Sequence, residues 1–269
     1  MNLSFKKDGS APFFENPVRD KNHVDHLRIP DPFESNDYLM HAIRLVKNTL
    51  SADKPLIGFT GSPWTLAAFM TEGEITKNLE VAKALLYREP ELLMQLLNKI
   101  TEAVKLYVEA QIIAGANIIQ IFDSLAGHLS KHDFLQYSLP YISDVVKYIK
   151  LKYGTRIPVI VFARGASHSI MEIQQIGSDV ISIDWTLSIK EAMALTGNTI
   201  TLQGNLDPVV LLASQPRIAG KVRELMLEAI ELKGFIFNLG HGILATTPEA
   251  NVRYLVDYVH ERSTMLKLE

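Results

Sequence analysis

The chain has 269 residues, of which 47% are hydrophobic and 21% are charged, and its formal net charge is −3. This composition is typical of a globular α/β domain, and so small a net charge offers no general attraction to nucleic acid or to an anionic membrane. The sequence contains no run of about 18 apolar residues, so it predicts no transmembrane helix. The absence of cysteine excludes a disulfide framework, a thiolate nucleophile and zinc sites with sulfur ligands, and it fits a cytoplasmic enzyme.

Residues 1–36 are polar and proline-rich, and we expect them to be irregular. After them, short apolar runs that resemble buried strands alternate with longer stretches of helical periodicity. The longest helical stretch covers 91–115 and ends at Gly115. This alternation predicts a parallel sheet covered by helices on both faces, in a single domain that spans 1–269. The strand-like runs are 56–61, 118–124, 158–165, 179–185, 199–205 and 234–242.

Each of the six runs ends in polar or small residues, and ligands of parallel α/β folds bind beyond the carboxyl ends of the strands. Six strands are two fewer than an eight-stranded barrel needs. The pattern therefore indicates either an open sheet or a barrel with two strand–helix units missing. The candidate site residues at the strand ends are Thr60, Ser62, Asp123, Ser124, Arg164, Asp184, Gln203, Asn205, Asp207, Asn238 and His241.

The stretch 57-IGFTGSPWTLAAFMTEG-73 has the pattern of a strand, a tight turn and a helix. Gly58 and Gly61 allow either a close approach of the backbone to a ligand or a tight turn with aromatic residues in the core. The two interpretations have equal weight from the residues alone.

Glycines flank His241 in the sequence 240-GHGILA-245, which fits the dinucleotide-binding fingerprint G-x-G-x-x-A. We reject that interpretation because only 24 residues follow and Pro248 interrupts the helix that should begin there. His241 is better interpreted as a site imidazole, with a plain loop histidine as the alternative.

His128 and His132 have the i, i+4 spacing of a helical metal pair, but Ser130 between them resembles a helix start, so a metal site is disfavoured. Asp123 and Asp184 are each a candidate general acid or base, or a cap of the following helix, and the structural role is slightly favoured for Asp184. Ser124 lacks the G-x-S-x-G context of a nucleophilic serine.

Taken together, these segments resemble the uroporphyrinogen decarboxylase family. The stretch 58–73 resembles the second signature of that family, and IPDP at 29–32 resembles the segment before it. IFDS, VFARG, SIDWT, TLQGNLDP and FNLGHG resemble its later strand ends, in the same order. The resemblance covers essentially the whole chain.

The resemblance implies a (β/α)8 TIM barrel, of which six strands are expected in this chain, and a homodimer that works without a cofactor or metal. The implied reaction removes the four acetate carboxyl groups of uroporphyrinogen III to give coproporphyrinogen III in heme biosynthesis. Ser124 and His241 match substrate-binding positions of the family, Phe59 matches a pocket-lining aromatic residue, and Arg164 falls where relatives carry a basic residue. Phe69 stands where the family usually has a substrate-binding tyrosine.

The family opens with two further strands, one ending in R-Q-A-G-R and one in S-D. The sequence R-Q-A-G-R does not occur here, and no strand is expected before residue 56. The family arginine pair and aspartate are therefore expected to be absent, and the catalytic residues stay unassigned. We expect a chain that begins after the second strand–helix unit of the family, with doubtful activity. The alternatives are a tetrapyrrole-binding paralogue without catalysis and, disfavoured by the missing cysteines, a zinc- and cobalamin-linked methyltransferase relative.

Overall fold

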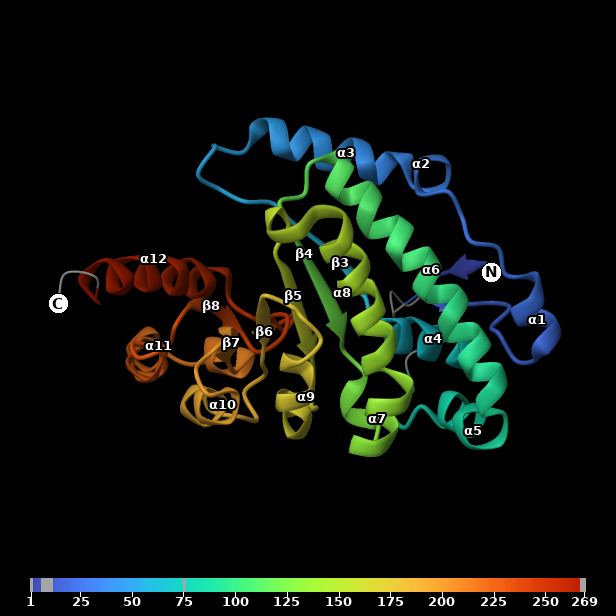
Figure 1. The fold of residues 1–269 in the computed structure, drawn as a ribbon. Coiled ribbons are helices and arrows are strands. Elements are labelled where there is room, and N and C mark those ends of the chain that lie inside the picture. The colour runs from blue at the N-terminus through green and yellow to red at the C-terminus, as the bar shows by residue number, and fades with distance from the viewer. Residues whose placement is uncertain (1, 6–11, 75, 267–269) are drawn as a thin grey trace. The chain divides into compact units, whose positions relative to one another are not determined.

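The computed structural model describes residues 2–5, 12–74 and 76–266 (Figure 1). The chain forms two compact units. The first comprises Met1–Ala166 with Ile176–Ser178, and the second comprises Ser167–Gln175 with Asp179–Glu269.

A three-stranded parallel sheet lies at the centre of the first unit. Its strands are β3 (Ile57–Gly61), β4 (Ile118–Asp123) and β5 (Val159–Ala163), hydrogen-bonded in that order. Between the strands run α4 (Pro63–Glu72), α5 (Glu80–Arg88), α6 (Pro90–Ala114), α7 (Lys131–Tyr137) and α8 (Leu139–Tyr153), with short 3-10 turns η1 (Ala126–His128) and η2 (Gly154–Arg156). The long helix α6 packs against β3, β4 and α8. It ends as expected at Gly115, which takes a positive φ of 119° that favours glycine.

The N-terminal segment contains more structure than its sequence predicts. It forms an antiparallel pair, β1 (Leu3–Ser4) with β2 (Phe13–Phe14), followed by α1 (Lys21–His26), α2 (Pro32–Ser35) and α3 (Asp37–Thr49). Asp20 and Asp31 cap the two short helices by accepting backbone N–H bonds from His23 and Phe33. The expectation of an irregular segment without strands before residue 56 was therefore wrong.

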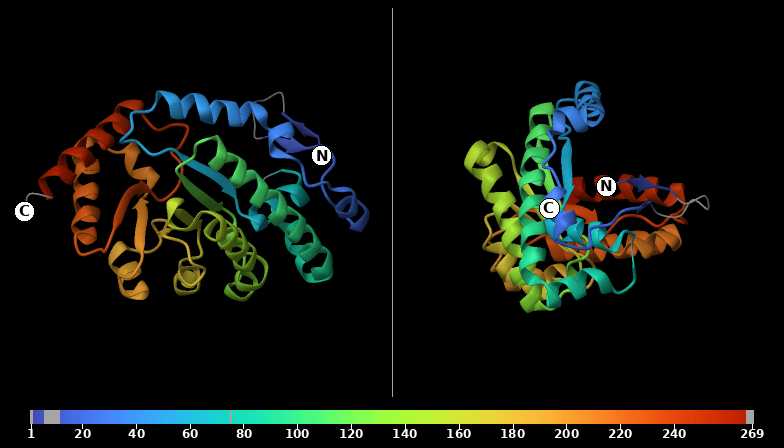
Figure 2. Two further views of the ribbon diagram at one scale, coloured as in Figure 1. Left: turned by 45° about the horizontal axis from the view of Figure 1, so that its top comes forward. Right: turned by 90° about the vertical axis from the view of Figure 1, so that its right-hand side faces the viewer.

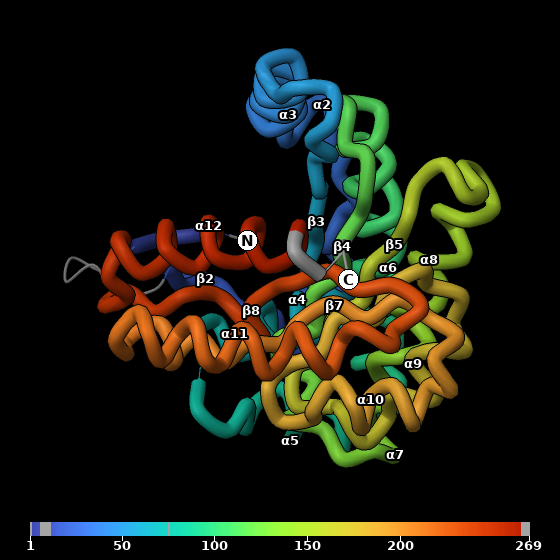
Figure 3. Tube along the Cα trace, turned by 90° about the vertical axis from the view of Figure 1, so that its left-hand side faces the viewer, coloured from blue at the N-terminus to red at the C-terminus, as the bar shows by residue number. Residues whose placement is uncertain are grey.

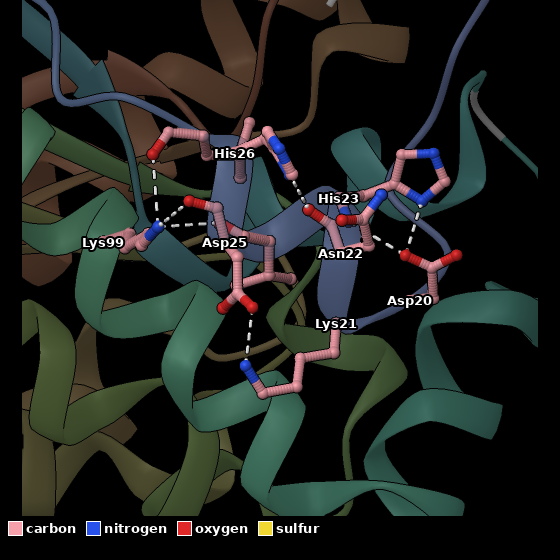
Figure 4. Close-up of polar contacts among 9 residues, drawn as sticks. Asp20, Lys21, Asn22, His23, Asp25, His26 and Lys99 are labelled. Carbon is pink, nitrogen blue, oxygen red and sulfur yellow. Dashed lines mark hydrogen bonds and ion pairs between the residues drawn. The ribbon is translucent and has the colours of Figure 1, made fainter.

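Two contacts with α6 hold this segment in place. The ammonium of Lys99 donates to the carbonyl oxygens of Val24, Asp25 and Leu27 at 2.7, 3.0 and 3.2 Å (Figure 4). The three carbonyls lie at the C-terminal end of α1, where that of Val24 also accepts from the N–H of Leu27, so the cation caps this end of the helix. Farther along, α3 lies beside the C-terminal half of α6, where Met40 is fully buried against Ala110 and Ala114 (Figure 2).

The second unit repeats the strand–helix alternation. Its parallel strands are β6 (Val180–Ser182), β7 (Thr201–Leu206) and β8 (Phe235–Leu239), in that order. Its helices are α9 (Ile170–Gln174), α10 (Ile189–Thr196), α11 (Gln215–Ala229) and α12 (Glu249–Leu266), with 3-10 turns η3 (Ser167–Ser169) and η4 (Pro208–Leu212). Helices α11 and α12 pack side by side (Figure 3).

All six strands predicted from the apolar runs are present, and the pairs β3–β4, β4–β5, β6–β7 and β7–β8 are parallel as predicted. In the described part of the chain, no helix combines the length and the apolar character needed to cross a membrane.

Candidate functional site

Three phenylalanines from neighbouring strands form a row on one face of the sheet of the first unit. Phe122 pairs in register with Phe162, and Phe59 lies two residues before Gly61, the register partner of Phe122. Side chains two apart on a strand share a face, so the three rings point to the same side. Their centroids are 5.9 Å apart in both pairs, with edge-to-face geometry. Phe59 is 62% exposed whereas Phe162 is 3% exposed, so the row runs from the surface into the core.

Ser124 and Arg164 follow directly on β4 and β5 and lie at the carboxyl end of this sheet. Ser124 is half-buried and Arg164 is exposed. The backbone holds Arg164 on both sides, because its N–H donates to the carbonyl of Asp123 at 3.0 Å and its carbonyl accepts from the N–H of Gly127 at 2.8 Å. These bonds fix the backbone of Arg164 at this end of the strands, and a guanidinium is suited to pair with a carboxylate.

Asp123 lies on the opposite face of β4 and is fully buried. Its carboxylate accepts from the hydroxyl of Thr65 at 2.7 Å and from the hydroxyl of Ser138. Burial raises the pKa of Asp123, while the hydrogen bonds from Ser138, Thr65 and Ser62 act in the opposite direction. The residue joins the starts of α4 and α8 to the end of β4. The geometry therefore supports its structural interpretation.

The turn that follows β3 is built by a helix cap and a buried indole. Ser62 accepts from the N–H of Thr65 at 3.0 Å, and Pro63 occupies the first position of α4. Trp64 is fully buried and its indole N–H donates to the carbonyl of Leu125 at 3.3 Å, so it is a packing residue. Thr60 is buried, and its hydroxyl donates to the carbonyl of Gly61. Phe69 is half-buried within α4 and does not belong to the strand-borne aromatic row.

The acidic and amide strand ends of the second unit are also engaged in local structure. Asp184 accepts from the N–H of Thr186 at 2.9 Å, and Asp207 accepts from the N–H of Val209 at 2.9 Å. Asn205 donates to the carbonyls of Asp184 and Leu187 at 3.0 and 2.6 Å. Asp184 does not cap the following helix as considered, because Ser188 caps α10, and its carboxylate bonds the turn before that helix instead.

His241 and the glycines on either side of it follow β8. The N–H of Gly242 donates to Nδ1 of His241 at 2.7 Å, which places the proton of the neutral imidazole on Nε2 and makes that atom a donor. A Cβ on Gly240 would lie 2.9 Å from the Trp185 ring, so this position needs glycine for packing. No helix follows these glycines until Glu249, as expected from the rejection of the dinucleotide fingerprint.

The remaining strand-end candidates lie on β7 and β8. Gln203 is buried and donates to the hydroxyl of Ser182 at 3.1 Å, whereas Asn238 is exposed and accepts from the N–H of Leu239.

His128 and His132 do not share one helix. His128 ends η1, His132 lies in the first turn of α7, and Ser130 between them caps α7 by accepting from the N–H of Asp133 at 3.1 Å. This confirms the predicted helix start. Burial lowers the pKa of His128, and the charges of Lys83 and Arg164 lower it further. Across the described ranges, no three His, Asp or Glu side chains gather in a way that could hold a metal ion.

The sequence analysis missed Phe122 and Phe162. Both lie within predicted strands, one and two residues before the candidates Asp123 and Arg164. Their positions near the strand ends could have identified them. In neighbouring parallel strands, residues at the same distance from the strand ends lie side by side on the same face of the sheet.

Comparison with known proteins shows similarity along the whole chain. The family model described as "Uroporphyrinogen decarboxylase (URO-D)" matches residues 1–262. A protein of Mannheimia succiniciproducens named uroporphyrinogen decarboxylase is 41% identical over 256 residues, which cover 95% of this chain and 72% of the relative. One of Histophilus somni with the same name is 40% identical over 264 residues, covering 98% of this chain and 74% of the relative.

A solved structure of a methyltransferase from Methanosarcina mazei has a TM-score of 0.79 and 19% sequence identity, and covers 97% of this chain and 75% of that protein. At this identity the likeness concerns the fold, which is α/β of the TIM-barrel type. The sequence matches carry the assignment further: the chain belongs to the uroporphyrinogen decarboxylase family.

Proposed function

We propose that this chain binds uroporphyrinogen III and catalyses its decarboxylation to coproporphyrinogen III. The observation that carries the proposal is the match over residues 1–262 to a family whose relatives, 40–41% identical, are named for this activity.

The reaction replaces each acetate carboxyl group by hydrogen. A proton adds to a ring carbon of the pyrrole, and the cationic ring accepts the electron pair of the breaking C–C bond as CO₂ leaves. A second proton then adds to the exocyclic carbon to make the methyl group, and the first proton is lost from the ring. The net change consumes one proton and releases one CO₂. The protein must hold a polyanion and stabilise a cationic ring in the transition state.

The residues of each unit have distinct proposed roles. In the first unit, the exposed ring of Phe59 offers an apolar surface to a pyrrole ring, Arg164 pairs with a substrate carboxylate, and the hydroxyl of Ser124 donates to one. In the second unit, the Nε2–H of His241 donates to a carboxylate. The half-buried Phe69 stands where the family usually has tyrosine, and it adds only apolar contact.

The experiment is an anaerobic assay of the purified chain with uroporphyrinogen III, in which the products are oxidised and separated as porphyrins by number of carboxyl groups. Production of seven- to four-carboxylate porphyrins is expected. His241→Ala should lower turnover at least tenfold, whereas His260→Ala, on the exposed surface of α12, should leave it unchanged. Phe69→Tyr should raise turnover. Equal turnover in His241→Ala and the unaltered chain would contradict the role of His241.

A second candidate is tetrapyrrole binding without turnover. The observation that favours it is the small number of basic side chains among the strand-end candidates, Arg164 and His241, for a substrate with eight carboxylates. Quenching of intrinsic fluorescence by uroporphyrin, with no product in the assay above, would select this candidate. Lack of both quenching and product would exclude both functions for the isolated chain.

A further inference from the structure

The loops that follow β4 and β5 are held together by their backbones. The N–H of Gly127 donates to the carbonyl of Arg164 at 2.8 Å. A Cβ on Gly127 would lie 3.1 Å from the Cα of Gly165, and a Cβ on Gly165 would lie 3.0 Å from the Cα of Gly127, so this close approach of the two loops needs glycine on both sides. Since His128 directly follows Gly127, the contact places His128 beside the end of β5 that carries Arg164.

A third basic residue comes to the same place from α5. The hydroxyl of Tyr87 donates to Oδ2 of Asp133 at 3.0 Å, which joins α5 to the first turn of α7, just after η1. Lys83 lies one turn before Tyr87 and therefore on the same face of α5. Burial lowers the pKa of His128, and the positive charges of Lys83 and Arg164 lower it further, so both cations act on this imidazole.

Lys83, His128 and Arg164 together form what we call the basic cluster, and it is open to solvent. Arg164 is exposed, and the other two residues are half-buried. In the described part of the chain, neither the ammonium of Lys83 nor the imidazole of His128 makes a hydrogen bond or an ion pair. Asp133 on the neighbouring helix already accepts from the hydroxyls of Ser130 and Tyr87 at 2.8 and 3.0 Å. An anion bound in the basic cluster would therefore offset the mutual repulsion of its positive charges.

The chemistry of decarboxylation indicates which anion the cluster suits. A carboxylate that leaves as CO₂ gives up its negative charge in the transition state, so cations paired with it stabilise the ground state and oppose the reaction. Paired cations are harmless on an arm that keeps its carboxyl group. In uroporphyrinogen III the acetate arms react and the propionate arms stay intact.

We infer that the basic cluster binds a propionate arm of the tetrapyrrole and so helps to fix the orientation of the macrocycle over the carboxyl ends of β4 and β5. The inference rests on the proposed function. It adds Lys83 and His128 to Arg164 as substrate-binding residues and assigns them to an arm that does not react.

The test measures the affinity of the purified chain for uroporphyrin and for coproporphyrin by fluorescence quenching. Coproporphyrin keeps the propionate arms but carries methyl groups in place of the acetates. Lys83→Met should weaken the binding of both porphyrins by the same factor, about fivefold to tenfold, because one charge-assisted hydrogen bond is lost. Lys83→Arg, which keeps the charge, should bind like the unaltered chain. The matched control is Arg88→Met, which removes a cation from another face of α5, where Arg88 lines a separate cavity with Leu85, and it should have no effect.

His128 supplies a second measurement. A bound carboxylate would raise the pKa of this imidazole, which the free chain holds below its ordinary value, so binding takes up a proton. The affinity for coproporphyrin should therefore rise as the pH falls from about 8 to about 6, and less so in His128→Gln. The difference between these two proteins isolates His128 from the other groups that titrate. The charged and titratable groups around it are Lys83 and Tyr87 on α5, His132 and Asp133 on α7, and Arg164 after β5.

Turnover separates this inference from the proposed function. Because a propionate arm does not react, Lys83→Met should raise KM for uroporphyrinogen III about fivefold to tenfold and leave kcat unchanged. Weaker binding of uroporphyrin alone would mean that the cluster holds an acetate and would overturn the inference. Equal binding by Lys83→Met and the unaltered chain, or no binding of either porphyrin, would overturn it as well. Lys83-dependent binding without decarboxylation would contradict the proposed function alone, and decarboxylation with the same KM in Lys83→Met would contradict this inference alone.

Discussion

The strands β3 and β5 belong to one sheet but meet different surroundings. Every residue of β5 is buried, whereas β3 alternates between buried and exposed side chains. The exposed residues of β3 include its two large apolar ones, Ile57 and Phe59, whereas Thr60 is buried, so the hydrophobicity of the side chains does not explain the difference. Each strand contributes a phenylalanine to the same row, and only the one on β5 is enclosed. Burial of a strand in this sheet is therefore decided by what covers it and not by its own side chains.

The two phenylalanines provide the strongest test of that contrast. Phe162→Ala should lower the free energy of unfolding by about 3–5 kcal/mol, because it leaves a cavity in a packed core. Phe59→Ala should cost at most about 1 kcal/mol, because most of that ring is already in water. Urea denaturation followed by circular dichroism measures both. Similar losses would show that β3 is as enclosed as β5.

A second test concerns the polar anchor behind the row. Asp123→Ala should cost about 2–4 kcal/mol, because two buried hydroxyls, those of Thr65 and Ser138, lose their acceptor. The matched control is Asp207→Ala, which removes a single bond to a backbone N–H and should cost about 1 kcal/mol. If the two variants melt alike, Asp123 does not anchor the strand end.

A third test concerns the attachment of the N-terminal segment to α6. Lys99→Met keeps the aliphatic stem but removes the three bonds to the end of α1. We expect local destabilisation of about 1–2 kcal/mol, seen as faster hydrogen exchange at 21–27. Lys105→Met on the same helix removes ion pairs with Glu102 and Asp144 instead, and should leave exchange at 21–27 unchanged. Unchanged exchange in Lys99→Met would show that α1 is held by other contacts.

The smallest effect is expected from His128. Its pKa is lowered in the folded chain by burial and by the charges of Lys83 and Arg164, so the unfolded chain binds the proton more readily. The stability that this histidine contributes is present above its ordinary pKa of about 6.5 and is lost as the pH falls through its folded value. Relative to His128→Gln, the unaltered chain should therefore lose stability between about pH 7 and pH 5. Parallel stability curves for the two proteins would contradict the shift.

The sequence predicted the strands and the long helix because their apolar periodicity is local. It did not predict α1, whose capping by Asp20 is local but whose C-terminal end depends on Lys99, 72–75 residues away in sequence. The same limit applies to the site. From the sequence, Asp123 is a plausible general acid. The structure shows that its carboxylate accepts hydrogen bonds from the hydroxyls of Ser138 and Thr65, and Thr65 is 58 residues away in the chain, so this engagement could not be predicted. The position of each candidate residue at a strand end could be predicted from the sequence, whereas the hydrogen-bond partners of its side chain could not.

Gln111 of α6 affects how the chain behaves in concentrated solution. A bare strand edge invites pairing with any passing strand, which is a common route to aggregation. Here the side-chain amide of Gln111 already accepts from the N–H of Phe59 and donates to its C=O. Another strand can pair fully with β3 only after this amide is displaced. One glutamine thus lowers the tendency of this edge to pair with other strands.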